Sequence, residues 1–178
     1  MPRIQTPALE SATGAAAAIF EQIKRVAGSV PHCYAAVGTL KPAVLKAILQ
    51  ADGVLSASAL SKQDQEVIKL IVSESAHCDY CIAAHSLLGM LAGLAPETLA
   101  QIRSGVPTGN LRRDALIRFV RTLQCTSGTI SDEAFASIKA VGYTDAHLVD
   151  ISLAIAVTTF TNVFNRINDT PVDIPLSF

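Results

Sequence analysis

Alanine restricts the fold of this chain more than any other residue, because it occupies 27 of the 178 positions. Alanine is the strongest helix former. Residues that favour strands are scarce, since aromatic residues make up only 5% and tryptophan is absent. The sequence also contains no alternating apolar and polar run, bounded by turn residues, that predicts a strand. We therefore expect an all-α fold.

The length of the chain fits one domain. Two domains would contain about 90 residues each, which is below the common domain size of ~100 to 150 residues. No low-complexity linker divides the sequence. We therefore expect a single helical domain over residues 1–178. Pro171 and Pro175 predict that residues 168–178 form an extended tail.

Residues typical of helix ends predict where the helices begin and end. Ser61 and the carboxylate of Asp64, three residues later, form a variant of the capping box and predict a helix that ends near Ala76. Other caps, prolines and glycines predict further helices at residues 14–27, 42–52, 78–93, from 96 onward, 111–126, 131–141 and 145–168. Residues 29–40, which include Pro31, are expected to be irregular.

The charge of the chain excludes two classes of partner. The 14 Lys and Arg residues balance 15 Asp and Glu residues, the net charge is −1, and no basic block occurs. Nucleic acid and anionic membrane surfaces are therefore excluded as main partners. The first ten residues contain no apolar leader segment, and the longest apolar run, residues 151–157, is far shorter than the ~20 residues of a membrane span. We expect a soluble, cytoplasmic protein.

The low charge also indicates self-association. Charged residues make up only 16% of the chain, against about 25% in an average soluble domain. The predicted helix at residues 145–168 carries apolar side chains on more than one face. We therefore predict a homo-oligomer whose interface uses this helix or the alanine-rich helix at residues 14–27.

Two thiols and an imidazole lie on one face of a predicted helix. Cys78 and Cys81 form a CxxC motif, and His85 follows four residues after the second cysteine. At 100° per residue these three positions fall within about 60° of one another. Gly89 and Ala92 continue the same face, and such small residues allow a second helix to approach closely. The face is therefore expected to point into the interior or into a narrow cleft.

Cysteine and histidine at this spacing fit more than one kind of site. A structural zinc site needs four ligands. The two cysteines and His85 supply three, His77 is adjacent, and no second CxxC or HxxxH occurs. A c-type haem needs histidine directly after the second cysteine, where Ile82 stands, and a thioredoxin-like fold needs strands. Zinc binding and thiol redox chemistry on a helical scaffold remain as alternatives.

A fourth residue makes the motif more specific. Glu66 lies twelve residues before Cys78, so the chain contains Glu-x11-Cys-x2-Cys-x3-His, ending at His85. This pattern, with the string CDYCIAAHS, resembles the signature of the alkylhydroperoxidase D family within the carboxymuconolactone decarboxylase superfamily. The resemblance is strongest over about residues 43–120. Residues 164–171 (FNRINDTP) are also similar to the larger peroxidase-related members.

The resemblance implies a helical bundle, homo-oligomers, and thiol-dependent reduction of hydroperoxides without metal, haem or other cofactor. It implies that Cys81 attacks the peroxide and becomes a sulfenic acid, and that Cys78 then closes a disulfide. It suggests a dithiol or lipoyl-type reductant. The founding member has a histidine directly before its second cysteine. Here Tyr80 stands at that place, which removes the basis for a proton shuttle there.

The signs of the charges set the order of a proton relay. A carboxylate beside a thiol raises the pKa of the thiol, so Glu66 cannot assist Cys81 directly. Glu66 can hold His85, and the imidazole or a bridging water then takes the thiol proton. The helix dipole favours Cys78 as the nucleophile, whereas the histidine favours Cys81, so the residues alone do not decide between them.

Two other functions are compatible with the sequence. Decarboxylation or isomerisation of a lactone, the chemistry for which the superfamily is named, would leave the thiols idle, and proton transfer at carbon needs no second thiol. A redox-sensing or assembly module would form the disulfide without catalytic turnover.

For several other side chains, the sequence is also compatible with a purely structural role. Lys69 is the expected partner of Glu66 if that carboxylate lies on a solvated face. Cys33 and Cys125 have no thiol or imidazole partner at a helical spacing and are expected to be small buried apolar residues. Tyr80 is expected to pack or to line the pocket, and His77 is a further candidate for lining the site.

Overall fold

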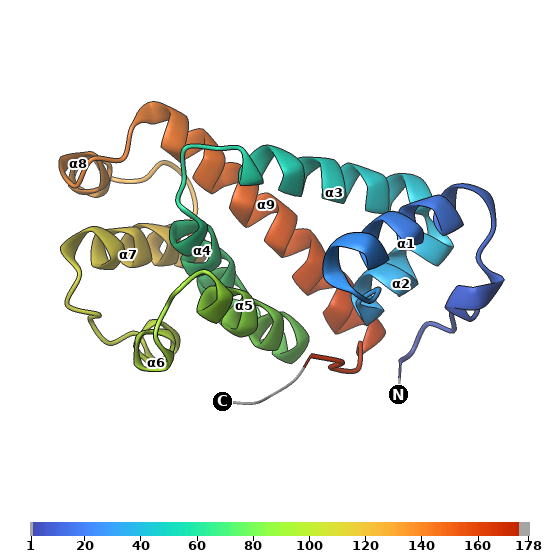
Figure 1. Cartoon of the computed structure of the whole chain (residues 1–178). Helices are drawn as coiled ribbons and strands as arrows, with labels where there is room; N and C mark the ends of the chain where they lie inside the picture. The colour runs from blue at the N-terminus through green and yellow to red at the C-terminus, as the bar shows by residue number, and fades with distance from the viewer. Residues whose placement is uncertain (1, 175–178) are drawn as a thin grey trace.

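Helices form all of the regular structure in the computed structural model, which describes residues 2–174 (Figure 1). The elements are the 3₁₀ helix η1 (Leu9–Ser11) and the α-helices α1 (Gly14–Ala27), α2 (His32–Leu40), α3 (Pro42–Ser56), α4 (Lys62–Ser75), α5 (Asp79–Leu91), α6 (Pro96–Ser104), α7 (Leu111–Cys125), α8 (Asp132–Ala140) and α9 (Asp145–Asn168). No strand occurs among the described residues, so the predicted all-α class is confirmed. Residues 175–178 of the predicted tail lie outside the described residues.

Side-chain caps hold four helix starts at the predicted positions. Ser61 Oγ accepts the backbone N–H of Asp64 at 3.0 Å and begins α4. The side chains of Asn110, Ser131 and Thr144 accept the backbone N–H three residues ahead and begin α7, α8 and α9. Each cap satisfies a backbone donor that has no partner inside the first turn. These starts could be predicted because the interaction is local in sequence.

The prediction of an irregular stretch at residues 29–40 is wrong, because α2 occupies most of it. Pro31 stands immediately before the helix, where a proline is tolerated. The helix buries Cys33 and Val37, and Gly38 leaves the space that the Phe20 ring of α1 occupies. Burial against neighbouring helices therefore outweighs the weak local signal.

Helix α3 is longer than the predicted range 42–52, because it continues through Gly53 to Ser56. A glycine inside a helix costs about 1 kcal/mol. Leu55 is fully buried in the continuation, and burial of a leucine side chain contributes roughly 1.5–3 kcal/mol. The free energy gained by burying Leu55 thus exceeds the free-energy cost of the glycine.

Helix α4 lies at the centre of the bundle. It contacts α5, α6, α7 and α9. Its residues from Gln65 to Ser73 are buried, apart from Lys69, which is partly exposed. Figure 1 shows α5 packed alongside α4, and α9 crossing the bundle beside both. Side chains on different faces of α4 therefore reach both the apolar core and the candidate site.

The buried apolar side chains form two clusters. The first, called here the α4–α7 cluster, consists of Leu55, Leu60, Val67, Ile68, Leu70, Ile71, Val72, Ile82, Leu94, Leu99, Ile102, Leu116, Ile117, Phe119, Val120, Ile138, Tyr143, Ile151 and Ala154. The second, called the N-terminal cluster, consists of Ala16, Phe20, Ile23, Val30, Cys33, Val37, Leu45, Ile48, Cys78, Tyr80 and Cys81. The motif cysteines thus belong to the second cluster.

Helix α9 buries polar residues and exposes apolar ones. The buried polar residues are Thr158, Asn162, Asn165 and Asn168. The exposed apolar residues, called here the α9 stripe, are Val149, Phe160, Val163 and Ile167. Among the described helices, α9 alone is long and apolar enough to cross a membrane by length and composition. It contacts α3, α4 and α5, as a helix of a bundle does.

The described part of the predicted tail folds back onto the start of α2. Residues 169–174 form no helix, as predicted. The backbone N–H of His32 donates to Asp173 Oδ2 at 2.8 Å, and the His32 ring Nδ1 lies 3.1 Å from the carbonyl oxygen of Pro171. These contacts hold the segment beside the start of α5, where it forms a wall of the candidate site.

Candidate active site

The two motif cysteines lie at the junction of α4 and α5. Cys78 is the N-cap of α5, and its Sγ accepts the backbone N–H of Cys81 at 3.4 Å. The prediction that Cys78 lies in the first turn is wrong, because its backbone is extended (φ −97°, ψ 93°) and stands before the helix. This conformation brings the two Cα atoms to 5.3 Å, within the range that a disulfide spans. Cys78 and Cys81 form a disulfide.

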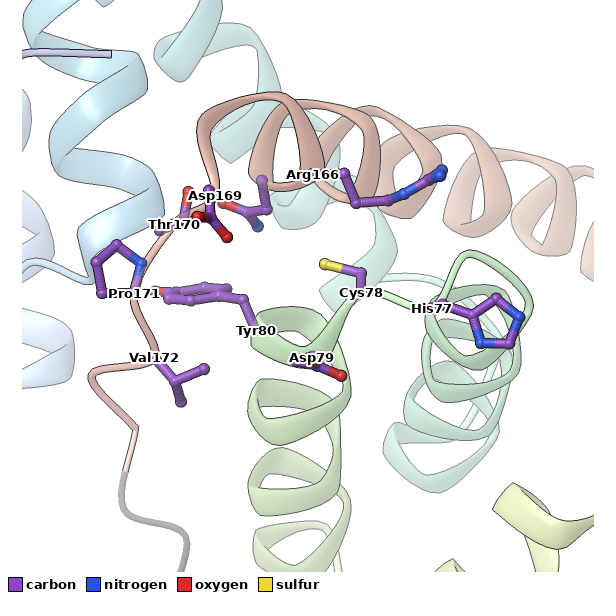
Figure 2. Close-up of a pocket in the computed structure, with 10 residues that line it drawn as sticks. His77, Cys78, Asp79, Tyr80, Arg166, Asp169, Thr170, Pro171 and Val172 are labelled. Atoms are coloured by element: carbon purple, nitrogen blue, oxygen red, sulfur yellow. The ribbon is translucent and has the colours of Figure 1, made fainter. Parts of the chain in front are cut away.

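A pocket of about 460 Å³ lies beside Cys78 (Figure 2). The α4–α5 junction, the end of α9 and the segment after it form its walls. In Figure 2 the sulfur of Cys78 points toward the end of α9, the ring of Tyr80 extends toward Pro171, and the ring of His77 points away from Cys78. Of the two motif cysteines, Cys78 lines the pocket, and His77 is also among the lining residues.

Two lining residues of the pocket have left-handed backbone conformations. His77 has φ 50° and Asp169, directly after α9, has φ 54°, and no other non-glycine residue among positions 2–174 has a positive φ. Such conformations cost free energy in residues with a side chain and occur frequently at functional sites. The walls of the pocket are therefore held by backbone conformations that the surrounding structure enforces.

The Glu66 carboxylate on α4 holds the His85 ring on α5. Oε2 of Glu66 lies 2.9 Å from Nδ1 of His85. A Cβ at Gly89, one turn after His85, would lie 2.9 Å from the Leu99 side chain of α6, so the glycine leaves the space that this side chain occupies. The small residue predicted to admit a neighbouring helix does so. The sequence therefore predicted the Glu66–His85 pair and, separately, the packing of a neighbouring helix against Gly89.

A chain of charged side chains extends from Glu66 toward the surface. Lys69 Nζ lies 3.5 Å from Glu66 Oε1 and 3.6 Å from Asp52 Oδ1. The hydroxyl of Tyr34 donates to Asp52 Oδ2 at 3.3 Å. The pair of Glu66 with Lys69 exists, but not on a solvated face, since the side chains are 11% and 13% exposed. Sequence reasoning missed Asp52 and Tyr34, which lie on α3 and α2.

These neighbours keep the Glu66 carboxylate ionised. Burial alone would raise the pKa of Glu66, but the hydrogen bond to His85 and the charges of His85 and Lys69 outweigh it. The pKa of Glu66 therefore lies below its ordinary value. An ionised Glu66 accepts the Nδ1 proton of His85, which leaves the other ring nitrogen to exchange a proton.

The last step of the predicted relay, from His85 to a motif cysteine, has no direct hydrogen bond among the described residues. Within residues 2–174, no hydrogen bond joins His85 to Cys81 or to Cys78. In the same part of the chain, no group of three or more His, Cys, Asp or Glu side chains is arranged to hold a metal ion. The His85 ring instead engages Glu66 through Nδ1.

Cys81 receives a hydrogen bond from a residue that sequence reasoning missed. Asn165 on α9 donates from Nδ2 to Cys81 Sγ at 3.3 Å. Asn165 and Cys81 are buried, at 3% and 2% exposed, and Asn165 also lines the pocket. Within the described residues, Asn165 Oδ1 is buried without a hydrogen-bond partner. The one signal in the sequence was that Asn165 falls within residues 164–171, the second segment of family resemblance.

Tyr80 and Cys33 are packed against each other beside the disulfide. The hydroxyl of Tyr80 accepts the backbone N–H of Cys33 at 3.4 Å. Burial raises the pKa of Tyr80 well above its usual range and that of Cys33 to about 12, so both keep their protons at neutral pH. The packing roles predicted for Tyr80 and Cys33 are confirmed. The prediction for Cys125 is wrong, because this cysteine is exposed at the end of α7.

A family model and several solved structures are similar to this chain. Residues 42–108 match the model of the carboxymuconolactone decarboxylase family, which overlaps the expected region. No curated protein matches the sequence. A crystal structure described as an alkylhydroperoxidase AhpD core, an uncharacterized peroxidase-related protein from Ralstonia eutropha JMP134, has a TM-score of 0.84 and 20% identity. The similarity covers 97% of this chain and 92% of that one.

Two further structures share the arrangement of helices. An uncharacterized peroxidase-related protein from Silicibacter sp. TM1040 has a TM-score of 0.84 and 20% identity, over 96% of this chain and 91% of that one. The debrominase Bmp8, crystallised in complex with 2,3,4-tribromopyrrole, has a TM-score of 0.81 and 17% identity, over 97% and 94% of the two chains. At these identities the similarity establishes the fold.

Proposed function

We propose that this chain, whose residues 42–108 match the carboxymuconolactone decarboxylase family and whose fold is that of alkylhydroperoxidase D-like structures, reduces hydroperoxides with Cys78 and Cys81. The observation that carries the proposal is the disulfide between these cysteines, next to the buried Glu66–His85 pair. A thiol pair that closes a disulfide supplies the two electrons that cleavage of a peroxide bond consumes.

The proposed reaction begins with the Cys81 thiolate. Its sulfur attacks the terminal oxygen of the hydroperoxide ROOH, the O–O bond breaks, and the products are the sulfenic acid of Cys81 and RO⁻, which becomes ROH on protonation. The Cys78 thiol then attacks the Cys81 sulfur and releases water as the disulfide forms. A dithiol reductant finally restores both thiols.

The positions of the two cysteines support this division of roles. Cys78 lines the pocket, where a dithiol or lipoyl-type reductant can reach its sulfur. Cys81 lies one turn into α5, and its sulfur contacts Asn165 rather than forming part of the pocket wall. Attack of the reductant on Cys78 would release Cys81 as the leaving thiolate, ready for the next peroxide.

In this proposal the Glu66–His85 pair accepts the thiol proton and later donates it to the leaving group. The ionised Glu66 fixes the Nδ1 proton of His85, so Nε2 can take the thiol proton, directly or through a water, and return it to RO⁻. Lys69 maintains the charge on Glu66. Cys33 is not a candidate nucleophile, because its raised pKa keeps the thiol protonated.

The test is peroxide consumption by the purified protein with a dithiol reductant. We expect wild-type protein to reduce an organic hydroperoxide, and we expect Cys81→Ser and Cys78→Ser to lose turnover by at least about a thousandfold. Cys125→Ser, which removes an exposed thiol far from the motif in sequence, is the matched control and should behave as wild type. Wild-type rates from Cys81→Ser would exclude the proposed chemistry.

A second candidate is thiol-dependent debromination, which the similarity to the debrominase and the pocket beside Cys78 favour. In that reaction a bromopyrrole ArBr and two thiols would give ArH, a disulfide and HBr, so the same cysteines would supply the electrons. Bromide release from 2,3,4-tribromopyrrole, measured beside peroxide consumption, distinguishes the two activities. Lactone decarboxylation is separated from both because it would persist in the Cys78→Ser, Cys81→Ser double variant.

We further propose that the protein is a cytoplasmic homo-oligomer that associates through the α9 stripe. The four side chains of the stripe fall within about 60° of one another around the helix, and all are exposed in the single chain. An uncharged apolar face of this kind is stabilised when a second copy covers it. Sedimentation equilibrium of wild type and Val163→Asp tests this, because the variant should dissociate and a monomeric wild type would exclude it.

A further inference from the structure

Asn165 differs from the other buried asparagines of α9 in the hydrogen bonds that its side-chain amide makes. Asn162 donates from Nδ2 to the carbonyl oxygen of Val72, and its Oδ1 accepts from the Ser73 hydroxyl. Both ends of that amide tie α9 to α4. Asn168 is also satisfied at both ends, because Nδ2 donates to Thr170 Oγ1 and Oδ1 accepts the backbone N–H of Ile4.

Only one end of the Asn165 amide has a partner among the described residues. Nδ2 donates to Cys81 Sγ, whereas Oδ1 is buried and accepts nothing. A buried acceptor without a donor destabilises the folded state. Structural tethering, which explains Asn162 and Asn168, therefore does not explain Asn165. A ligand that enters the pocket lined by Asn165 can supply the missing donor.

We propose that Asn165 is a catalytic residue whose Nδ2 stabilises the Cys81 thiolate and whose Oδ1 accepts the O–H of the incoming hydroperoxide. This inference rests on the proposed peroxide reduction and names a residue for it. It also identifies the substrate feature that the site recognises, a terminal O–H on the peroxide oxygen that is attacked.

The Cys81 thiolate needs a donor of this kind. Its sulfur is buried among apolar side chains, where burial disfavours the charged form. Glu66 carries a negative charge and would disfavour it further. A hydrogen bond from Nδ2 to the sulfur acts in the opposite direction and favours the thiolate. Asn165 thus supplies stabilisation that the Glu66–His85 pair does not.

The two ends of the amide fit successive stages of the reaction. The hydroperoxide O–H donates to Oδ1 and holds the terminal oxygen beside the thiolate. When the sulfur attacks that oxygen and RO⁻ leaves, the hydrogen stays on the oxygen as the O–H of the sulfenic acid, which continues to donate to Oδ1. Attack by Cys78 then expels this oxygen, which leaves as water after it takes up a proton.

The test measures the pKa of the Cys81 thiol without any peroxide. In a background of Cys78→Ser and Cys125→Ser, the rate of alkylation by iodoacetamide is followed against pH, with mass spectrometry to confirm Cys81 as the site. Cys33 stays protonated because of its raised pKa. Asn165→Ala should raise the pKa of Cys81 by about one unit, so alkylation at neutral pH falls about tenfold. Asn165→Asp should raise it further, because it places a carboxylate on the sulfur.

Asn162→Ala is the matched control, because it removes an equally buried amide one turn away on the same helix. It should leave the pKa of Cys81 unchanged even if it lowers stability. The kcat/KM for tert-butyl hydroperoxide, in proteins that retain Cys78, should fall by about tenfold or more in both Asn165 variants.

The outcomes separate this inference from the proposed function. Asn165 variants that titrate and turn over like Asn162→Ala would overturn the role of Asn165. Loss of the folded state in both variants, judged by circular dichroism, would assign Asn165 a structural role and also overturn it. If wild type consumes no hydroperoxide, the proposed function fails, while the alkylation profile still decides whether Asn165 stabilises the thiolate.

Discussion

The two buried clusters differ in the chemistry that they contain. The α4–α7 cluster consists of aliphatic and aromatic side chains, whereas the N-terminal cluster contains Cys33, Cys78, Tyr80 and Cys81. The amide of Asn165 contacts the second cluster, and the pocket opens at its edge. Helix α9 contributes to both regions, because Ile151 and Ala154 belong to the first cluster and Val157 and Phe164 pack against the second. The comparison indicates that one region supplies most of the packing energy and the other supplies the reactive groups.

Replacement of Leu116 by alanine tests the structural side of this comparison and has the largest expected effect. Leu116 is fully buried in the α4–α7 cluster. Its truncation removes apolar contacts and leaves a cavity, so the free energy of unfolding should fall by about 2–5 kcal/mol. Urea denaturation followed by circular dichroism measures the change. Leu111→Ala on the same helix is the control, because Leu111 is 83% exposed and should change stability by less than about 0.5 kcal/mol.

The same Leu116→Ala protein should keep its chemistry while it is folded. Its kcat/KM for hydroperoxide, measured well below the unfolding transition, should stay within about twofold of wild type, because distant sites act independently. A large loss of activity in the folded variant would show that the two clusters are coupled, and the comparison would fail.

Glu66→Gln tests the part of the comparison that concerns the reactive groups. The substitution keeps the shape of the side chain but removes the charge that holds the His85 proton. Loss of this acid–base assistance should lower kcat/KM by about a hundredfold. Steady-state kinetics with excess dithiol measure it. Glu97→Gln, at an exposed acid in the first turn of α6, is the control and should match wild type. An unaffected Glu66→Gln would remove the pair from the mechanism.

Lys69→Met should have a smaller effect and should appear in the pH profile. Without the Lys69 charge, burial raises the pKa of Glu66 with less opposition. The acid limb of the kcat/KM profile should therefore move to higher pH, by up to about one unit. Lys62→Met, at an exposed lysine at the start of α4, should leave the profile in place. An unshifted acid limb in Lys69→Met would show that Lys69 has only a packing role.

The acid stability of the protein should show the smallest effect. The pKa of Glu66 is lowered in the folded state, so its ionised form stabilises the fold at pH values above the ordinary 4.5. This contribution is lost as the pH falls below 4.5 and through the lower folded-state pKa. In Glu66→Gln the free energy of unfolding should therefore fall less steeply over that acid range than in wild type. Urea titrations at successive pH values measure both slopes, and equal slopes would contradict the prediction.

The sequence predicted those parts of the site that depend on short spacings. Cys78, Cys81 and His85 lie within eight residues, and the family pattern added Glu66, which the structure brings to His85. The sequence did not indicate that Cys78 would stand outside the helix. Its N-cap position depends on the left-handed turn at His77, which follows from how α4 and α5 meet.

Local chemistry in the sequence determined the helix class, four capped helix starts and the motif, because caps and helix faces involve residues within about one turn of each other. Tertiary structure decided the formation of α2, the continuation of α3 and the faces that α9 buries, because these depend on what packs against each helix. It also decided the contact of Asn165 with Cys81, which are 84 residues apart. No local pattern specifies such a contact, since the position of α9 relative to α5 is set by packing of the whole bundle.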